Sequence, residues 1–258
     1  MQHIIFLTSP LEQFSTNPIF PILGYLLDFS FTTGAIIFTL ISLFSVLFVC
    51  SLIKPNSFTY YIIPNSWQYA VERLNLLIIS LVTENVKDKK AQSLIPLVYF
   101  VFHFNLLMNM FGLIPYSFTI TSHIIVTFFM ALVIFIGIQI IGVRKHNIHY
   151  FCMLLPPDTS TTLAFLLVPI EFLSFISKPI SLAIRLFANM MAGHTLLKVI
   201  AGFSSTMISC GGLMVLWSYV PMLVLLILIY LEAVVAMIQT FVFSILIAIY
   251  LNEALNLH

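Results

Sequence analysis

The stretch that decides the fold is TMISCGGLMVLWSYVPMLVLLILIYLEAVVAMIQTFVFSILIAIYL, residues 206–251, in which Glu232 is the only charged residue. At 1.5 Å per residue, a helix of this length spans roughly 60 Å, about twice the hydrocarbon thickness of a bilayer. The run before it, residues 163–203, is also apolar, but it carries five ionisable side chains: Glu171, Lys178, Arg185, His194 and Lys198. Each run predicts either one steeply inclined helix or shorter helices. The break would lie near Pro179 in the earlier run and near Pro221 in the later one.

The composition of the whole chain requires a membrane. Of its 258 residues, 61% are hydrophobic and 7% are charged, and the mean hydropathy is +1.11. A soluble domain carries roughly a quarter charged residues, and a disordered chain has the opposite composition. The strands of a membrane β-barrel alternate apolar and polar residues, which these long apolar runs do not. We therefore expect an all-α polytopic membrane protein.

The same composition argues against several other classes. A net charge of +1 leaves no basic face for nucleic acid. The three cysteines are scattered and make no CxxC pair, so we expect them to pack as small apolar residues: Cys50, Cys152 and Cys210. Four further histidines form no matched axial pairs: His103, His123, His146 and His149. We therefore expect no haem, no metal and no cofactor.

The apolar and polar runs predict a single membrane domain over residues 1–258. In chain order, its expected parts are an N-terminal segment (1–30), a transmembrane helix (31–53), an interfacial helix (67–86), a transmembrane hairpin (94–143) and a long two-helix hairpin (161–252). The interfacial assignment follows from apolar residues at helical spacing, with Glu72, Arg73 and Glu84 on other faces.

Basic residues near the span ends predict the orientation. Seven of the ten lie on one side if the spans alternate: Lys54, Arg73, Lys87, Lys89, Lys90, Arg144 and Lys145. The opposite side, residues 1–30 and 115–121, has none. The amino terminus is therefore expected outside, and the carboxy terminus inside if each of the last two apolar runs crosses the membrane once.

Charges at bilayer depth are candidates for function, because each costs about 2.5 kcal/mol or several times that. Lys178 and Lys198 can reach an interface by snorkelling. Arg185 remains protonated at any relevant pH and lies near the middle of its run. A structural ion pair with Glu171 or Glu232 is one reading. Glu171 is about four helical turns away, so a pair within the same helix is disfavoured.

A polar stripe runs along one side of the helix expected over residues 163–203. Its side chains recur at steps of three or four residues: Ser174, Ser177, Ser181, Arg185 and Asn189. Small polar residues in membranes often join helices through hydrogen bonds. The arginine favours a water-accessible seam instead. His194 lies nine residues beyond Arg185, on the opposite face and about 13 Å along the axis.

On the last helix, Glu232 and Gln239 are seven residues apart and share a face, with Ala236 between them. A desolvated glutamate without a fixed cation can exchange protons. Gln239 could instead make a hydrogen bond between helices.

These residues resemble the signature of subunit a of F-type ATP synthases, in its mitochondrial form. The central motif is RLFANMMAGH, residues 185–194. The resemblance extends to SPLEQF (9–14), to NMFGLIPY and SFTITSH (109–123), and to the plant and algal ending YLNEALNLH (250–258). Lys178-Pro179 stands where relatives commonly have Arg-Pro. The lysine keeps the positive charge but lacks the planar guanidinium group that can make two parallel hydrogen bonds.

The resemblance implies a long tilted hairpin that wraps against a rotating ring of c subunits. It implies that Arg185 is the essential stator arginine, facing the ring carboxylate, with Asn189 and Gln239 beside it. His194 and Glu232 would line the proton path from the intermembrane space, and Glu171 the path to the matrix. The serines of the polar stripe would support them.

The resemblance further implies a proton-conducting subunit that is not an enzyme by itself. Its partners would be the c ring, other Fo stator and peripheral-stalk subunits, lipids and protons. Its place would be the mitochondrial inner membrane, with the N-terminus in the intermembrane space and the C-terminus in the matrix. The chief alternative is a secondary transporter with a midplane ionisable site, which would favour internal repeats that the two halves lack. A purely structural assembly subunit is disfavoured by the cost of Arg185.

Overall fold

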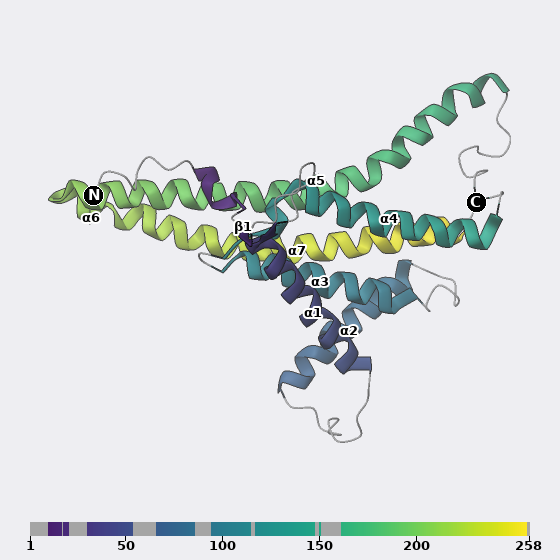
Figure 1. Cartoon of the computed structure of the whole chain (residues 1–258), viewed down its shortest axis with the longest axis horizontal. Helices are drawn as coiled ribbons and strands as arrows, with labels where there is room; N and C mark the ends of the chain where they lie inside the picture. Colours follow the sequence, from purple (N-terminus) through teal and green to yellow (C-terminus); the bar gives the residue numbers. More distant parts are fainter. Residues whose placement is uncertain are drawn as a thin grey trace. The chain divides into compact units, whose positions relative to one another are not determined.

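The computed structural model describes residues 10–16, 18–20, 30–53, 66–85, 94–114, 117–147, 150 and 161–256 (Figure 1). The chain divides into two compact units. The first unit comprises Met1–Leu43, Asn105–Val126 and Arg185–Thr240, and the second comprises Phe44–Phe104, Thr127–Ile184 and Phe241–His258. Several helices contribute one part to each unit.

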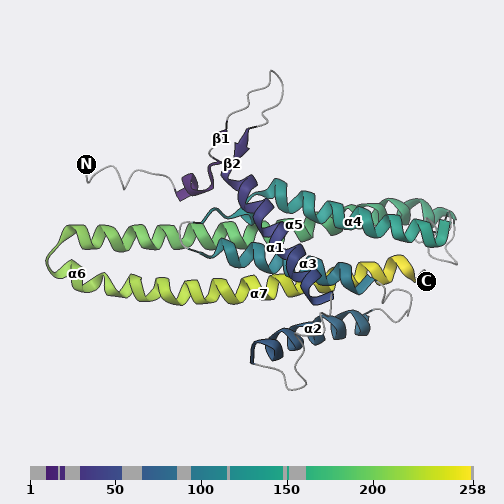
Figure 2. The ribbon, with the colours of Figure 1, turned by 60° about the horizontal axis from the view of Figure 1, so that its bottom comes forward.

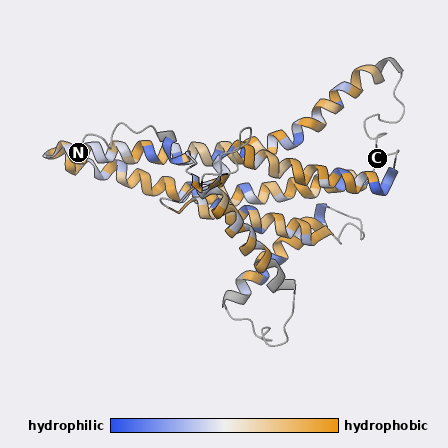
Figure 3. Ribbon diagram, in the orientation of Figure 1, coloured by the Kyte–Doolittle hydropathy of each residue, from blue (hydrophilic) through white to orange (hydrophobic). Residues whose placement is uncertain are grey.

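The described residues are mainly helical. The helices are α1 (Thr33–Ile53), α2 (Ser66–Asn85), α3 (Ile95–Gly112), α4 (Ile124–His146), α5 (Thr161–Cys210), α6 (Leu213–Trp217) and α7 (Tyr219–Leu255). By length and composition, α3, α4, α5 and the segment Leu213–Leu255 can cross a membrane. Their apolar character is visible along the ribbons in Figure 3. The expectation of an all-α polytopic membrane protein is thus confirmed.

The two remaining long helices differ from these four. The described apolar part of α1 covers Thr33–Phe48, which is shorter than a full span. Helix α2 forms over Ser66–Asn85 and is not among the helices apolar enough to cross. Its placement at a membrane surface stays a prediction.

The N-terminal segment contributes short elements to the first unit. A 3-10 helix, η1, covers Pro10–Phe14, and strand β1 (Pro18–Phe20) pairs antiparallel with β2 (Phe31–Thr32). Helix α1 begins directly after β2. At Gly34, an added Cβ would lie 2.7 Å from Cε1 of Phe118, so the absence of a side chain lets α1 pack against the connection between α3 and α4. That connection contains a second 3-10 helix, η3 (Ile120–Ser122).

The long apolar runs break at glycine rather than at proline. Helix α5 continues through Pro169 and Pro179 over 50 residues. The chain leaves the helix at Gly211 and Gly212, where φ is +70° and +61°, values that glycine adopts without strain. Pro221 falls in the first turn of α7, where a missing backbone N–H removes no helical hydrogen bond.

The core of the second unit is mainly apolar. It includes Ile78 of α2, Val98 of α3 and Ile138 of α4, together with Phe243 and Leu251 of α7, all nearly inaccessible. The hydroxyl of Tyr99 donates a hydrogen bond to Oδ1 of Asn75, which joins α3 to α2. These contacts hold the shorter helices by packing, which supplies most helical stability in proteins.

Some sequence expectations fall outside the described residues. They concern residues 1–8, His149 and Cys152. They also include four of the lysines from which the orientation is predicted: Lys54, Lys87, Lys89 and Lys90. Cys210 is a free thiol, exposed at the end of α5 rather than packed among side chains of this chain. The expectation that it packs inside is therefore wrong, because it lies at the turn where α5 ends.

Candidate functional site

In the first unit, the second part of α5 and the first part of α7 run side by side (Figure 2). The turn at Gly211–Gly212 and α6 join them, so the two segments are antiparallel. Apolar side chains of this part of α7 point outward, for example Leu223 and Leu226. Polar side chains instead gather where α7 meets α5, and a third contribution comes from α3.

The first pair at this contact is His194 of α5 and Glu232 of α7. Nε2 of His194 lies 3.6 Å from Oε1 of Glu232, and the two side chains are 15% and 7% exposed. In the described part of the chain, neither carboxylate oxygen of Glu232 has a hydrogen-bond partner. The structure therefore brings together two side chains that lie 38 positions apart in sequence, and both can bind and release a proton.

Gly193 makes this approach possible. An added Cβ there would lie 2.5 Å from Oε1 and 2.8 Å from Cδ of Glu232. The space for a side chain on α5 is occupied by the carboxyl group. The glycine of the motif is thus required for close approach rather than for an unusual backbone angle.

We expect Gly193→Val to push the Glu232 carboxyl away from His194 and to lower proton-driven ATP synthesis about tenfold, which corresponds to about 1.4 kcal/mol in the barrier of the proton-transfer step. The measurement is ATP synthesis by the purified complex in vesicles at a fixed proton gradient. Gly202→Val is the matched control on the same helix, because an added Cβ there meets nothing within 4 Å. Equal rates for the two variants would contradict this role of Gly193.

The second pair is Asn189 of α5 and Gln239 of α7. Nδ2 of Asn189 donates a 3.1 Å hydrogen bond to Oε1 of Gln239. Gln239 is buried, whereas Asn189 is exposed. The sequence allowed Gln239 to make a hydrogen bond between helices, and this bond is present. The partner is Asn189, the asparagine of the polar stripe.

Asn109 of α3 was not expected at the site. It is buried, and its Nδ2 donates to Oγ1 of Thr240 at 3.2 Å and to the carbonyl oxygen of Ala236 at 3.5 Å. It lines a small cavity together with Asn189, Glu232 and Gln239. An asparagine within an apolar span was the available sequence signal, because such a residue needs partners.

Arg185 lies on α5 within the first unit and is exposed. Among the described residues it makes no ion pair or hydrogen bond. Within the described ranges, the reading of a structural ion pair with Glu171 or Glu232 is therefore not supported, and the side chain that approaches Glu232 is His194.

The earlier part of α5 belongs to the second unit. There the three serines of the polar stripe, Ser174, Ser177 and Ser181, are exposed, and Glu171 is half-buried. The Ser177 hydroxyl donates to the carbonyl oxygen of Ser174 at 2.7 Å, a bond within the helix.

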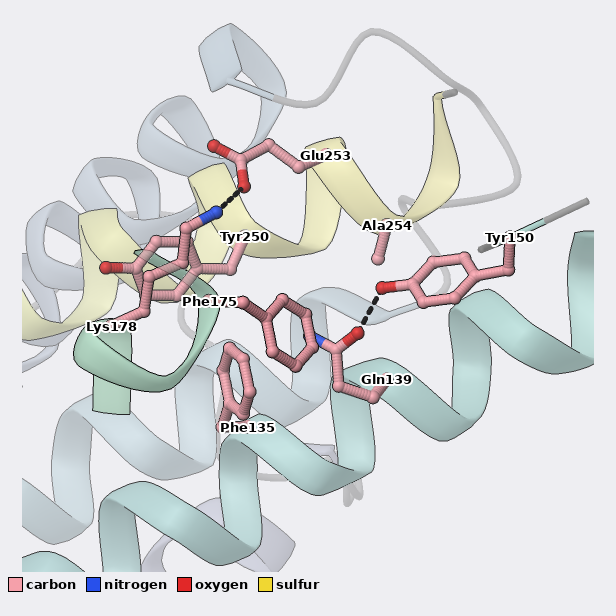
Figure 4. Close-up of a pocket in the computed structure, with 8 residues that line it drawn as sticks. All are labelled: Phe135, Gln139, Tyr150, Phe175, Lys178, Tyr250, Glu253 and Ala254. Atoms are coloured by element: carbon pink, nitrogen blue, oxygen red, sulfur yellow. Dashed lines mark hydrogen bonds and ion pairs between the residues drawn. The ribbon is translucent and has the colours of Figure 1, made fainter. Parts of the chain in front are cut away.

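A separate polar cluster lies in the second unit (Figure 4). Nζ of Lys178 lies 2.6 Å from Oε2 of Glu253 and 5.2 Å from the centroid of the Tyr250 ring. The Tyr150 hydroxyl donates to Oε1 of Gln139. Burial, and then the charge of Glu253, raises the pKa of Tyr150, so the phenol remains protonated and donates. Lys178 thus has an acid partner that sequence reasoning missed.

The side chains gathered in the first unit include groups that can exchange protons. No group of three or more His, Cys, Asp and Glu within the described ranges could hold a metal ion. What the first unit assembles is a buried carboxyl group, an imidazole, three amides and an exposed guanidinium group. These groups can carry, orient and repel protons.

Comparison with known proteins gives a consistent result. A family model described as ATP synthase A chain matches residues 35–252. The ATP synthase subunit a of Pylaiella littoralis is 48% identical over 253 residues, which cover 97% of this chain and 99% of that protein. The subunit a of Chondrus crispus is 43% identical over 258 residues, all of both chains. That of Marchantia polymorpha is 42% identical over 252 residues, 97% of this chain and 99% of that protein.

Proposed function

Because this chain belongs to the family of subunit a of ATP synthase, we propose that it conducts protons to and from a ring of c subunits through two offset half-paths. The chain is a membrane subunit of the Fo sector and not an enzyme by itself. The proton flow turns the ring against this stator, and the rotation drives ATP synthesis elsewhere in the complex.

The observation that carries the proposal is the exposed, unpartnered Arg185 on an apolar helix. Among the described residues, no acid of this chain neutralises it. A permanent cation in a membrane span requires an anion or water nearby. A carboxylate on a neighbouring ring subunit supplies that anion and is attracted only while it is ionised.

The two half-paths use different residues of this chain. His194 and Glu232, in contact across α5 and α7, load protons from the intermembrane side. Glu171, fourteen residues before Arg185 on α5, receives protons on the matrix side. Asn189 and Gln239, joined by a hydrogen bond, hold the region next to the arginine. Ser174, Ser177 and Ser181 give the exposed face of α5 its polarity.

Rotation is obligatory because Arg185 separates the half-paths. A neutral ring carboxyl can turn through lipid at low cost, whereas an ionised one must stay near the arginine. The fixed positive charge repels a proton that would pass directly between the paths. A proton therefore crosses the membrane only while it is bound to a ring carboxylate, which carries it through nearly a full turn of the ring.

The location follows from the same proposal. The chain lies in the mitochondrial inner membrane, with its amino terminus in the intermembrane space and its carboxy terminus in the matrix. The positions of the basic residues support this orientation. Its partners are the c ring, the other Fo stator and peripheral-stalk subunits, and lipids.

Cross-linking tests whether the face of α5 that carries Arg185 meets the ring. In a chain whose three native cysteines are replaced by alanine, Ala188→Cys should cross-link to a cysteine placed beside the ring carboxylate. Ala188 is exposed one turn beyond Arg185. Ala183→Cys on the same helix is the matched control, because Ala183 is 1% exposed. Cross-linking of the control alone would reject the proposed face.

A further inference from the structure

The carboxy-terminal end of α7 is buried in the second unit. Ala254 and Leu255, the last two residues of the helix, are 1% and 7% exposed. The last four carbonyl groups of a helix have no partner within it, so a buried end needs donors from elsewhere. The backbone N–H of Asn256 supplies one of them, to the carbonyl oxygen of Asn252 at 2.8 Å. The carbonyl oxygen of Leu255 still requires a donor from another element.

Two basic side chains of α4 supply that donor. Nζ of Lys145 donates to the carbonyl oxygen of Leu255 at 2.9 Å, and Nε2 of His146 lies 2.8 Å from the same oxygen. A carbonyl oxygen only accepts hydrogen bonds and has two lone pairs, so both contacts can be made at once. Nε2 of His146 must therefore carry a hydrogen. The negative end of the helix dipole of α7 also attracts the lysine cation.

The contact selects two of the three basic side chains in the last turn of α4. Helix α4 ends in Arg144, Lys145 and His146, and Asn147 follows with a φ of +52°, a left-handed conformation that often ends helices. Lys145 and His146 turn to α7, whereas Arg144 is exposed and makes no ion pair or hydrogen bond among the described residues. A general attraction between a cationic turn and a helix end would not distinguish these side chains.

The turn of α7 that receives these bonds also carries an ion pair. Glu253 lies two residues before Leu255, and its Oε2 is 2.6 Å from Nζ of Lys178 on α5 (Figure 4). The two side chains are partly exposed, and such pairs contribute little alone, because ordering two long side chains costs entropy. A backbone that is already fixed at Leu255 removes part of this ordering cost on the side of Glu253.

We infer that Lys145 and His146 form a clamp that fixes the last turn of α7 and thereby holds Glu253 against Lys178. The inference goes beyond the proposed function and does not rest on it, because every residue concerned belongs to the second unit. Since the clamp consists of two hydrogen bonds, it can open locally while the rest of α7 remains packed. Opening exposes Ala254 to water and separates Glu253 from Lys178.

A thiol at position 254 reports the opening of the clamp in the intact complex. Ala254→Cys is introduced into a chain whose three native cysteines are replaced by alanine, and the rate of maleimide labelling is measured in the purified complex. We expect Lys145→Leu and His146→Leu each to raise this rate about fivefold, because one net hydrogen bond changes an opening equilibrium by about that factor. The two substitutions together should raise the rate about 25-fold.

Matched variants separate the clamp from general effects of charge and of unfolding. Arg144→Leu removes a cation from the same turn and should keep the slow rate. Lys145→Arg and His146→Gln retain a donor at nearly the same place, so labelling should stay close to that of the unmodified clamp. Ala248→Cys is the control reporter, because Ala248 is 0% exposed and lies about two turns earlier on α7. It should label slowly in every variant.

A zero-length cross-link tests whether the clamp holds the ion pair. A water-soluble carbodiimide joins a carboxyl group to an amine in contact with it, and the reagent takes up the water that formation of the amide bond releases. In the chain with its native clamp, peptide mass spectrometry should find Glu253 joined to Lys178. The Lys145→Leu, His146→Leu double variant should lower the yield of this product about fivefold or more.

Three results would overturn the inference. The first is labelling at position 254 that is as slow in the double variant as with the native clamp. The second is equal acceleration at positions 254 and 248, which would mean that α7 unpacks as a whole. The third is an unchanged yield of the Glu253–Lys178 product despite faster labelling, which would reject the hold on Glu253. If the double variant does not assemble, the two single variants carry the same test.

Discussion

Replacing Arg185 with alanine is expected to abolish proton-driven ATP synthesis and to leave a passive proton leak through the membrane sector. Without the fixed cation, the two half-paths are no longer separated electrostatically. Protons then cross without turning the ring, and the energy of about 2.3 kcal/mol per charge per 100 mV is dissipated. ATP synthesis should fall to the background of vesicles that lack the complex.

The measurement combines ATP synthesis with the decay of a pH gradient in vesicles that contain the purified complex. Arg144→Ala is the control, because Arg144 is an exposed cation at the end of α4 and lies outside the site. This control should remain coupled and tight to protons. Coupled synthesis in the Arg185 variant would reject the role assigned to the arginine.

The second large effect is expected for Glu232→Gln. Glutamine has almost the same size and fits beside Gly193, but it cannot take up and release a proton. Loss of a positioned proton-transfer group slows a step by about 10²-fold or more. We expect ATP synthesis to fall to that extent and its dependence on pH to change on the intermembrane side only.

Vesicles in which the inner and outer pH are set separately provide the measurement for Glu232→Gln. Glu84→Gln, at an exposed position of α2, is the control and should keep the original profile on both sides. A Glu232 variant with an unchanged profile, or one changed on the matrix side, would assign the carboxyl group to a different path.

Part of the site was evident from single residues. A charged side chain within an apolar run is costly, so Arg185, His194 and Glu232 were conspicuous without any coordinates. The spacing of Glu232 and Gln239 also placed both on one helix face, and both are buried. Their roles in proton transfer stay proposals.

Other parts could not be read from the sequence. Lys178 and Glu253 are 75 positions apart and form an ion pair in the second unit, although each alone looks like a solvated end of a span. Asn109 reaches Thr240 across 131 positions. Helical periodicity gives the face of a residue but not the helix that packs against it, so such partners were missed.

The sequence by itself determined that the chain is an α-helical membrane protein of the subunit a family, because hydrophobic run length and a specific motif are local properties. Only the tertiary structure decided that α5 runs unbroken through its prolines, that Gly193 makes room for the Glu232 carboxyl group, and that three amides and that carboxyl group line one cavity. These outcomes depend on which helices approach each other and how closely, and that is set by side-chain packing summed over segments far apart in the chain.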